Sequence, residues 1–278
     1  MSAAIDIVIV SYNARADLER CLQSPRAHRP ARPVTLTVVD NASTDGSADA
    51  ARRLWPDAQV LVQPENLGFS RANNIGIRAS RSPLVLLLNG DTVVPAGAID
   101  RLAGALEAVP SAAVAGPRLV DAAGRPELSF GQMISPWNEL RQKVLGRLYD
   151  RGVPPVVAWV RRQTASRHFP AWVSGACLLV WRADAEAVGL LDERYFMYTE
   201  DVDFCAALRA RGRRILFTPA AEVVHLRGRS AATAPAATAA LYRRSQLAFY
   251  EKHHPGWAPW LRAYLRWRGV AVPPPVLS

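Results

Sequence analysis

Short apolar runs alternate with amphipathic stretches along the N-terminal third of the chain. Residues 5–10, 34–39, 59–62 and 84–88 are largely apolar runs of strand length, and the segments between them have apolar positions at helical spacing. The run 84–88 is apolar at every position, which is typical of a strand buried on both faces of a parallel sheet. This alternation predicts an α/β fold with a Rossmann-like, mostly parallel central sheet flanked by helices.

Polar residues directly follow these expected strands. Tyr12 follows the first run, Asp40 the second and Asp91 the fourth. In a parallel α/β sheet, ligands bind at the carboxyl ends of the strands. We therefore expect the ligand site of this protein at that edge of the sheet.

The second half of the chain is less regular. Residues 131–168 lose clean periodicity, so we expect an insertion or a mobile segment there. Residues 172–181 are expected to form a strand, 200–211 a helix, and 214–217 and 222–225 two short strands. The Ala/Thr-rich stretch 230–240 is expected to be a linker that leads into a C-terminal helical extension.

Composition indicates a folded protein with one large domain, or one domain with a small appendage. The chain has 278 residues, of which 50% are apolar, which is enough for a substantial core. Its 34 basic and 24 acidic residues give a net charge of +10, which suits nucleic acid, an anionic membrane or a phosphate-bearing small molecule. We expect no nucleic-acid partner, because the chain has no recognisable nucleic-acid-reading motif. A Rossmann dehydrogenase or a nucleotidyltransferase would need a glycine-rich loop after the first strand, and residues 11–15 do not form one.

The cysteines and the N-terminal apolar run indicate in which cellular compartment the protein works. The 3 cysteines are odd in number and widely spaced, so they predict neither a disulfide framework nor a zinc cluster and fit a reducing compartment. The run 5–10 contains Asp6 and is far too short to span a bilayer. We expect a cytoplasmic protein, and contact with the inner face of the cell membrane stays open.

Three groups of residues could carry chemistry, and each also has a purely structural interpretation. Asp91 could bind a hard cation, or it could turn a loop. Glu200, Asp201 and Asp203 could raise one another's pKa and supply a general base, or they could favour a helix N-terminus. His225 could ligate a metal or contact a phosphate, although a lone histidine is more often a packed residue.

Seven short motifs occur in a fixed order between residues 5 and 230. They are the residues 9–13 (IVSYN), 38–47 (VVDNASTDGS), 66–69 (NLGF) with 73–76 (NNIG), 88–91 (LNGD), 174–176 (SGA), 198–203 (YTEDVD) and His225. Each motif alone is weak, but the ordered set is highly specific. The chain resembles family 2 glycosyltransferases, and the rhamnosyltransferase-like members most.

The resemblance implies a GT-A fold over residues 1–230, followed by a C-terminal helical extension at 231–278. The nucleotide-binding half would span 1–95, and the acceptor and catalytic half would span 96–230. Tyr12 would pack against the nucleotide base, and Asp40 would accept a hydrogen bond from it. The same pocket is expected to include Asn13, Asn41, Asp45, Asn66, Gly68, Asn73, Asn74 and Asn89.

The resemblance also implies an inverting reaction that depends on Mn²⁺ or Mg²⁺. Asp91 matches the last acid of the family's DxD motif, which ligates the metal, and His225 matches a histidine that completes the metal site in some relatives. Asp201 matches the catalytic base, and Glu200 is the second candidate for that role. Asp203 is expected to support the start of the helix.

Two features of the motifs stay unexplained by the resemblance. The chain has Asn89 where the DxD motif has its first acid, so only one carboxylate remains and metal affinity is expected to be modest. Arg71 lies within the 66–74 loop and has no assigned role; it could approach the base or a phosphate, or face solvent.

The expected reaction moves a sugar from dTDP-rhamnose or a UDP-hexose to a glycan or lipid-linked acceptor in cell-surface polysaccharide synthesis. The alternative is a catalytically inactive nucleotide-sugar-binding module of a polysaccharide assembly complex, and the presence of both Asp91 and Asp201 argues against it. The C-terminal stretch has apolar residues at helical spacing, which could dock on the protein itself, on a second subunit of a homodimer or on an anionic membrane. These residues are Trp257, Trp260, Leu261, Tyr264 and Leu265.

Overall fold

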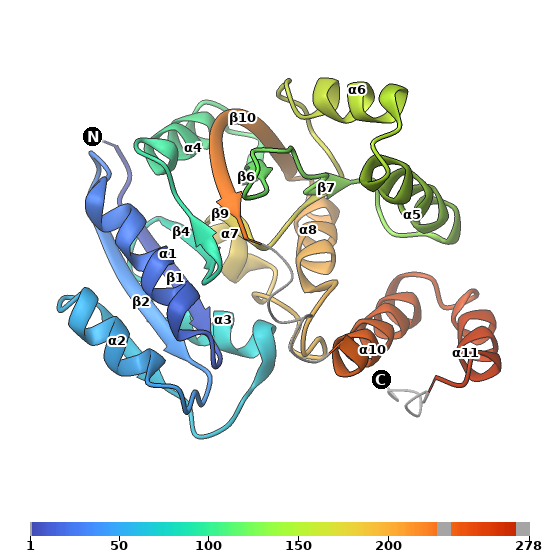
Figure 1. Cartoon of the computed structure of the whole chain (residues 1–278), viewed down its shortest axis with the longest axis horizontal. Coiled ribbons are helices and arrows are strands. Elements are labelled where there is room, and N and C mark those ends of the chain that lie inside the picture. The colour runs from blue at the N-terminus through green and yellow to red at the C-terminus, as the bar shows by residue number, and fades with distance from the viewer. Residues whose placement is uncertain (1, 227–234, 271–278) are drawn as a thin grey trace.

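A computed structural model describes residues 2–226 and 235–270 of the chain. Its centre is an eight-stranded sheet with the strand order β3-β2-β1-β4-β9-β6-β10-β5, around which the helices are arranged (Figure 1). The strands are β1 (Ile5–Ser11), β2 (Val34–Asp40), β3 (Gln59–Val62), β4 (Leu84–Asn89), β5 (Thr92–Val93), β6 (Ala112–Val120), β9 (Cys177–Trp181) and β10 (Arg214–His225). A separate two-stranded sheet pairs β7 (Phe130–Gly131) with β8 (Trp172–Val173).

The first four strands of the sheet are parallel, as the sequence predicted. β1 pairs in parallel with β2 on one side and with β4 on the other, and β2 pairs in parallel with β3. β9 is inserted between β4 and β6 and runs antiparallel to both, whereas β10 is parallel to β6. The expected mostly parallel α/β sheet is therefore confirmed, with one antiparallel strand in its middle.

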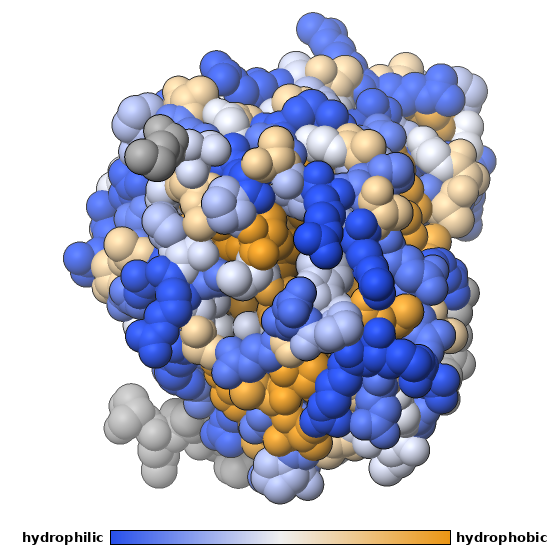
Figure 2. Space-filling model, turned by 90° about the vertical axis from the view of Figure 1, so that its left-hand side faces the viewer, coloured by the Kyte–Doolittle hydropathy of each residue, from blue (hydrophilic) through white to orange (hydrophobic). Residues whose placement is uncertain are grey.

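Two apolar clusters lie on opposite faces of this sheet. Alternate residues of β1 point to opposite sides, so Ile7 belongs to one cluster and Val8 to the other. The first cluster includes α1 (Arg15–Ala27), α2 (Ser47–Leu54) and α4 (Ala98–Glu107), and the second includes α3 (Gly68–Ala79), α7 (Arg182–Ala187) and α8 (Glu200–Ala210). The side of the molecule at the left of Figure 1 carries hydrophilic side chains over much of its surface, with apolar residues showing between them (Figure 2).

The segment 131–168, expected to be an insertion or a mobile segment, contains two helices. These are α5 (Pro136–Asp150) and α6 (Pro154–Gln163). Each begins with a proline, which suits the first helical turn because its missing N–H has no intrahelical partner there, and the Ser135 side chain caps α5. The only buried residue of α5 is Glu139, so the helix has no apolar core-facing stripe for the sequence to show.

Three other expected boundaries differ from the structure. Residues 172–181 form β8 and β9 in different sheets rather than one strand, and 214–217 and 222–225 are parts of a single strand, β10, with a register irregularity between Thr218 and Glu222. The expected linker at 230–240 is partly helical, because α10 (Pro235–His253) begins inside it. Residues 227–234 lie outside the described part of the chain, so the remainder of the linker is not described.

The C-terminal extension consists of α10 and α11 (Ala258–Trp267), and α10 is fastened to the body of the protein. Lys252 Nζ lies 2.8 Å from Asp203 Oδ2, and His253 Nε2 lies 2.6 Å from Asp203 Oδ1. Asp203 therefore does not simply support the start of α8, as expected, but anchors α10 to it. Within residues 2–226 and 235–270, no helix has both the length and the apolar composition needed to cross a bilayer.

Gly76 allows α3 to pack closely on β1, and this gives a stability prediction. A Cβ at position 76 would lie 2.2 Å from Val8 Cγ1, which the sheet cannot accommodate without a shift. We expect Gly76→Ala to lower the free energy of unfolding by about 1–3 kcal/mol, measured by chemical denaturation. Gly104→Ala is the matched control: a Cβ there meets nothing within 4 Å, and removing a helical glycine should stabilise the protein by about 0.5–1 kcal/mol. Equal effects of the two substitutions would contradict this account of the packing.

Candidate functional site

The carboxyl ends of β1 and β2 present one buried acid and one exposed ring. Ser11 and Asp40 are paired in register, so both strands end at the same level. Asp40 is 1% exposed, and its Oδ2 accepts a hydrogen bond from the Ser43 amide at 3.1 Å. The ring of Tyr12, which directly follows β1, is half exposed. This strand edge thus offers an apolar ring beside a buried hydrogen-bond acceptor.

Unpartnered polar atoms gather at this same edge. Among the described residues, Ser11 Oγ, Asp40 Oδ1 and Asn89 Oδ1 are buried side-chain atoms without a hydrogen-bond partner in the protein. Their residues end β1, β2 and β4, three neighbouring strands. Buried polar groups are nearly always paired in folded proteins, so these atoms fit a polar ligand at the strand ends.

Asn13 and Asp45 shape the loops beside this edge. Asn13 Oδ1 accepts a hydrogen bond from the Thr44 amide at 2.8 Å. Asp45 accepts from the Arg15 amide at 2.8 Å and from the Ser47 amide at 3.0 Å, so one carboxylate fastens the starts of α1 and α2. Burial raises the pKa of Asp45, but the hydrogen bonds outweigh it and the net pKa is lowered. Both side chains therefore hold the two loops together.

The 66–68 loop is fixed from two sides. Asn41 Nδ2 donates to Asn66 Oδ1 at 2.7 Å, which ties the loop to the end of β2. Gly68 has φ of +81°, and a Cβ there would lie 2.4 Å from the Phe196 carbonyl oxygen. The Phe69 amide donates to the same carbonyl at 2.6 Å. The start of α3 is thereby held against the segment that precedes α8.

Three other residues of this motif region have partners within the protein. Asn74 is fully buried and bonds the backbone of Leu191 through both its Nδ2 (2.8 Å) and its Oδ1 (3.0 Å). Its side-chain amide thus holds the 191 loop to α3. Asn73 Nδ2 donates to the Phe69 carbonyl at 2.9 Å, within the same helix. Arg71 is exposed and forms an ion pair with Glu193 at 3.5 Å.

Asp91 and His225 are far apart in the sequence but adjacent in the structure. β5 and β10 pair in antiparallel register with Thr92 opposite His225, and the Leu226 amide donates to the Asp91 carbonyl at 2.9 Å. As a result, Asp91 Oδ1 lies 3.4 Å from His225 Nε2. The described residues contain no group of three or more His, Cys, Asp or Glu placed to hold a metal. One carboxylate with one imidazole still fits a hard divalent cation that takes its remaining ligands from phosphate and water.

Glu127 completes this pair, and the sequence analysis missed it. The residue is buried, and its Oε2 lies 3.3 Å from His225 Nδ1. Burial lowers the pKa of His225, but Asp91 and Glu127 outweigh it and raise the pKa to about 9. A carboxylate on the second ring nitrogen fixes the orientation of an imidazole ligand. No sequence signal marks Glu127, because it follows β6 in a segment without periodicity.

The candidate bases stand at the start of α8 and differ in their surroundings. Asp201 accepts hydrogen bonds from the Gly175 and Val202 amides, both at 2.8 Å. Glu200 is buried, and its Oε2 has no hydrogen-bond partner among the described residues. Burial raises the pKa of both carboxyls, and the charge of Asp201 raises that of Glu200 well above its usual range. The amide donors favour the anion of Asp201 and partly offset its burial, whereas the charge of Asp201 adds to the effect of burial on Glu200.

A two-residue segment joins the end of β4 to Asp201. The Asn89 amide donates to the Ala176 carbonyl at 2.9 Å, and the adjacent Gly175 amide donates to Asp201. Asn89 lies two residues before Asp91. The end of β4, which leads to Asp91, is therefore hydrogen-bonded to the segment that also holds Asp201.

The turn before α8 is strained and is supported by the C-terminal extension. Tyr198 and Thr199 have φ of +72° and +64°, left-handed conformations that cost non-glycine residues free energy. The Tyr198 ring packs edge-on against Tyr242 of α10, and Ser245 Oγ donates to the Met197 carbonyl at 2.6 Å. α10 thus stabilises the turn that sets the position of Glu200 and Asp201.

Comparison with known sequences gives a consistent family. A model described as "Glycosyl transferase family 2" matches residues 6–168. The chain is 34% identical to the N-acetylglucosaminyl-diphospho-decaprenol L-rhamnosyltransferase of Mycobacterium tuberculosis, over 96% of this chain and 89% of that protein. It is 24% identical to the low-salt glycan biosynthesis hexosyltransferase Agl10 of Haloferax volcanii, over 80% of this chain and 66% of that protein.

Comparison with solved structures confirms the fold. The mannosyltransferase PcManGT of Pyrobaculum calidifontis, in complex with GDP-Man and Mn²⁺, superposes with a TM-score of 0.61 at 19% identity, covering 95% of this chain and 69% of that chain. GalNAc-T7, with UDP, GalNAc and Mn²⁺, gives a TM-score of 0.61 at 16% identity, covering 81% of this chain and 44% of that chain. The expected GT-A fold is present. Given the match to the family model and the relative at 34% identity, the chain belongs to glycosyl transferase family 2.

Proposed function

We propose that this protein is an inverting, metal-dependent hexosyltransferase that transfers rhamnose from dTDP-rhamnose to a lipid-linked glycan acceptor. The observation that carries the proposal is the hydrogen-bonded link from β4, through residues 175–176, to Asp201. This link joins the strand that leads to the Asp91 and His225 pair with the carboxylate that can accept a proton. Donor activation and deprotonation of the acceptor then occur at one edge of the sheet.

The strand ends provide the donor site. The exposed ring of Tyr12 stacks on the nucleotide base, and the unpartnered Oδ1 of Asp40 accepts a hydrogen bond from the pyrimidine ring N–H. Asp91 and His225 would hold Mn²⁺ or Mg²⁺, which when bound would supply positive charge to the departing diphosphate. A UDP-hexose is the competing donor, because uracil and thymine present the same ring N–H.

Asp201 serves as the general base. It takes the proton of the acceptor hydroxyl while that oxygen forms a bond to the anomeric carbon of the sugar. The bond from the anomeric carbon to the diphosphate oxygen breaks on the opposite face, and the diphosphate leaves with the electron pair. Displacement on the far face inverts the anomeric configuration, and protonated Glu200 adds no second negative charge beside the base.

The acceptor is inferred from the relative at 34% identity, whose name gives it a diphospho-decaprenol substrate. We place this protein in the same class of reaction, on a saccharide carried by a polyprenyl diphosphate, in cell-surface polysaccharide synthesis. Such an acceptor stays in the membrane, so the enzyme would work in the cytoplasm at the inner membrane face.

Nucleotide binding tests the donor site and the metal pair. We expect calorimetric titration of dTDP or UDP to show binding that Mn²⁺ or Mg²⁺ strengthens, and Asp91→Ala to remove that metal enhancement because only His225 would remain. The stronger of the two nucleotides identifies the donor. Absence of binding under every metal condition would contradict the transferase proposal.

Paired substitutions test the choice of base. We expect Asp201→Asn to lower kcat by about 10²–10⁴-fold with little change in nucleotide affinity, because the amide cannot take a proton. Glu200→Gln should retain far more activity, since glutamine resembles the protonated acid already present. Sugar transfer to a lipid-linked acceptor, followed by chromatography, measures both. The reverse order of damage would assign the base to Glu200.

Glu127 is predicted to position His225 for metal binding. We expect Glu127→Gln to weaken metal-dependent nucleotide binding by about 10–100-fold, while binding without metal stays unchanged. Glu222→Gln is the control. Glu222 is exposed on β10, the strand that carries His225, and pairs only loosely with Arg118 at 3.6 Å. A uniform loss of binding with and without metal would indicate a general structural role for Glu127 instead.

A further inference from the structure

Exposed apolar side chains gather on α5 and α11, two helices at the same end of the molecule. α5 exposes Trp137, Leu140 and Val144, which recur at positions i, i+3 and i+7. The aromatic residues of the α11 segment do the same at i, i+3, i+7 and i+10, and the last is 80% exposed; they are Trp257, Trp260, Tyr264 and Trp267. We call these seven residues the aromatic end surface.

The opposite face of α11 is packed on the protein. Ala258 and Leu265 are buried, and Leu261 packs against the same cluster as Phe249 of α10. The stripe expected from the sequence therefore divides: its leucines dock on the body of the protein, and its aromatic residues point outward. Among the described residues, these four aromatic side chains of the α11 segment lie outside the packed core.

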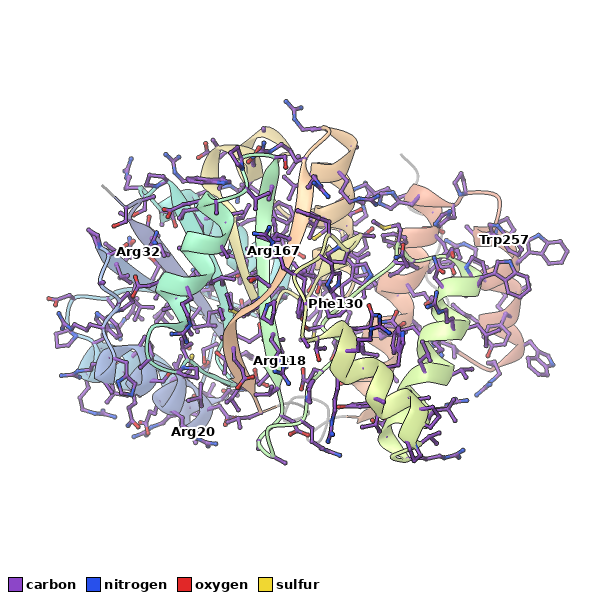
Figure 3. All side chains as sticks on the ribbon, turned by 90° about the horizontal axis from the view of Figure 1, so that it is seen from above. Arg20, Arg32, Arg118, Phe130, Arg167 and Trp257 are labelled. Atoms are coloured by element: carbon purple, nitrogen blue, oxygen red, sulfur yellow. The ribbon has the colours of Figure 1, made fainter. Side chains whose placement is uncertain are left out.

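The segments that precede α5 and α11 are held together. His254 Nε2, in the connection before α11, lies 2.7 Å from the Ile134 carbonyl oxygen just before α5. Trp257 and Trp137 each follow these bonded residues by three positions. Figures 1 and 3 both show the two helices at the same end of the molecule, and Figure 3 shows Trp257 projecting from it. The Glu139 carboxylate of α5 also accepts hydrogen bonds from Gln246 and Tyr250 of α10, which locks the helices together.

The charged residues around this surface are mostly basic. Exposed cations flank the apolar stripes on both helices; they are Arg141, Lys143, Arg147, Arg266 and Arg268. Of the acids on α5, α10 and α11, Glu139 is buried and Glu251 is paired with Arg262, whereas Asp150 is exposed at the last residue of α5. Aromatic residues among exposed cations are the side chains that settle at the headgroup level of an anionic bilayer.

We propose that the aromatic end surface docks the enzyme on an anionic lipid bilayer. The proposal rests on the proposed function in one respect, since a lipid-linked acceptor gives the docking its purpose. A second copy of the chain fits the surface less well. In a two-fold symmetric contact the same patch faces itself, so the basic surface of one copy would face the basic surface of the other. Phospholipid headgroups with negative charge complement them instead.

Docking at this end would also orient the catalytic helix. α10 connects α11 to the body of the protein, and Lys252 and His253 of α10 contact the Asp203 carboxylate. Asp203 lies two residues after Asp201 in α8. α10 therefore connects the helices that contact the bilayer to α8, which carries Asp201. Lipid-linked acceptors would then reach Asp201 at a fixed distance from the bilayer surface.

Vesicle sedimentation of the full chain tests the docking. We expect binding to vesicles of phosphatidylcholine mixed with phosphatidylglycerol, and little binding to phosphatidylcholine alone. The double variant Trp260→Ala/Trp267→Ala should weaken partitioning by about tenfold or more, and Arg141→Gln/Arg268→Gln by about fivefold per charge. The matched controls are Val62→Ala and Arg52→Gln/Arg53→Gln, which change exposed residues of β3 and α2, away from this surface.

The outcomes separate docking from catalysis. Failure to bind anionic vesicles, or equal losses in the test and control variants, would overturn the proposal. A dimer in light scattering that the tryptophan variant dissolves would overturn it in favour of a second copy of the chain. Nucleotide calorimetry on the same variants reports on the transferase site alone, so vesicle binding without nucleotide binding would leave the docking standing and reject the proposed function. If the tryptophan variant retains transfer to a short water-soluble acceptor but loses transfer to an acceptor in vesicles, the result would support both the docking and the proposed function.

Discussion

The hydrogen bonds made by residues 175–176 are the constraint on which the site depends. Asn89 at the end of β4 bonds to the Ala176 carbonyl, and the Gly175 amide bonds to Asp201. β9 begins at the next residue and runs antiparallel through the middle of the sheet, so this segment is fixed by the core on one side. Residues 175–176 therefore hold the end of β4 and the first turn of α8 in fixed positions relative to each other.

The two acids at the start of α8 show how unequal hydrogen bonding separates chemically similar groups. They are neighbours in sequence and both are removed from water, yet only Asp201 receives amide donors from outside its own turn. An anion beside a neutral acid avoids the repulsion that two buried anions would suffer. The turn that positions them is strained, by about 1–3 kcal/mol for each left-handed residue, and needs support from the surrounding structure.

The sequence predicted the elements whose burial leaves a periodic trace. β1, β2 and β4 are buried apolar runs, and each was found where expected. α5 was missed because it buries only Glu139, and Glu127 was missed because it contacts His225 across 98 positions of chain. Asn74 and Asp203 lie within recognised motifs, but their roles are set by partners on distant loops and helices that local sequence cannot reveal.

The support that Tyr242 and Ser245 give to the 197–199 turn has a consequence for how this enzyme can diversify. In many proteins a terminal extension is a module that can be gained, lost or exchanged without harm to the domain that precedes it. Here α10 of the extension supports the 197–199 turn, and the other end of the extension carries the exposed tryptophans. Changes in the two are therefore coupled, because a change in how the extension meets its surroundings is transmitted to the turn that positions Glu200 and Asp201.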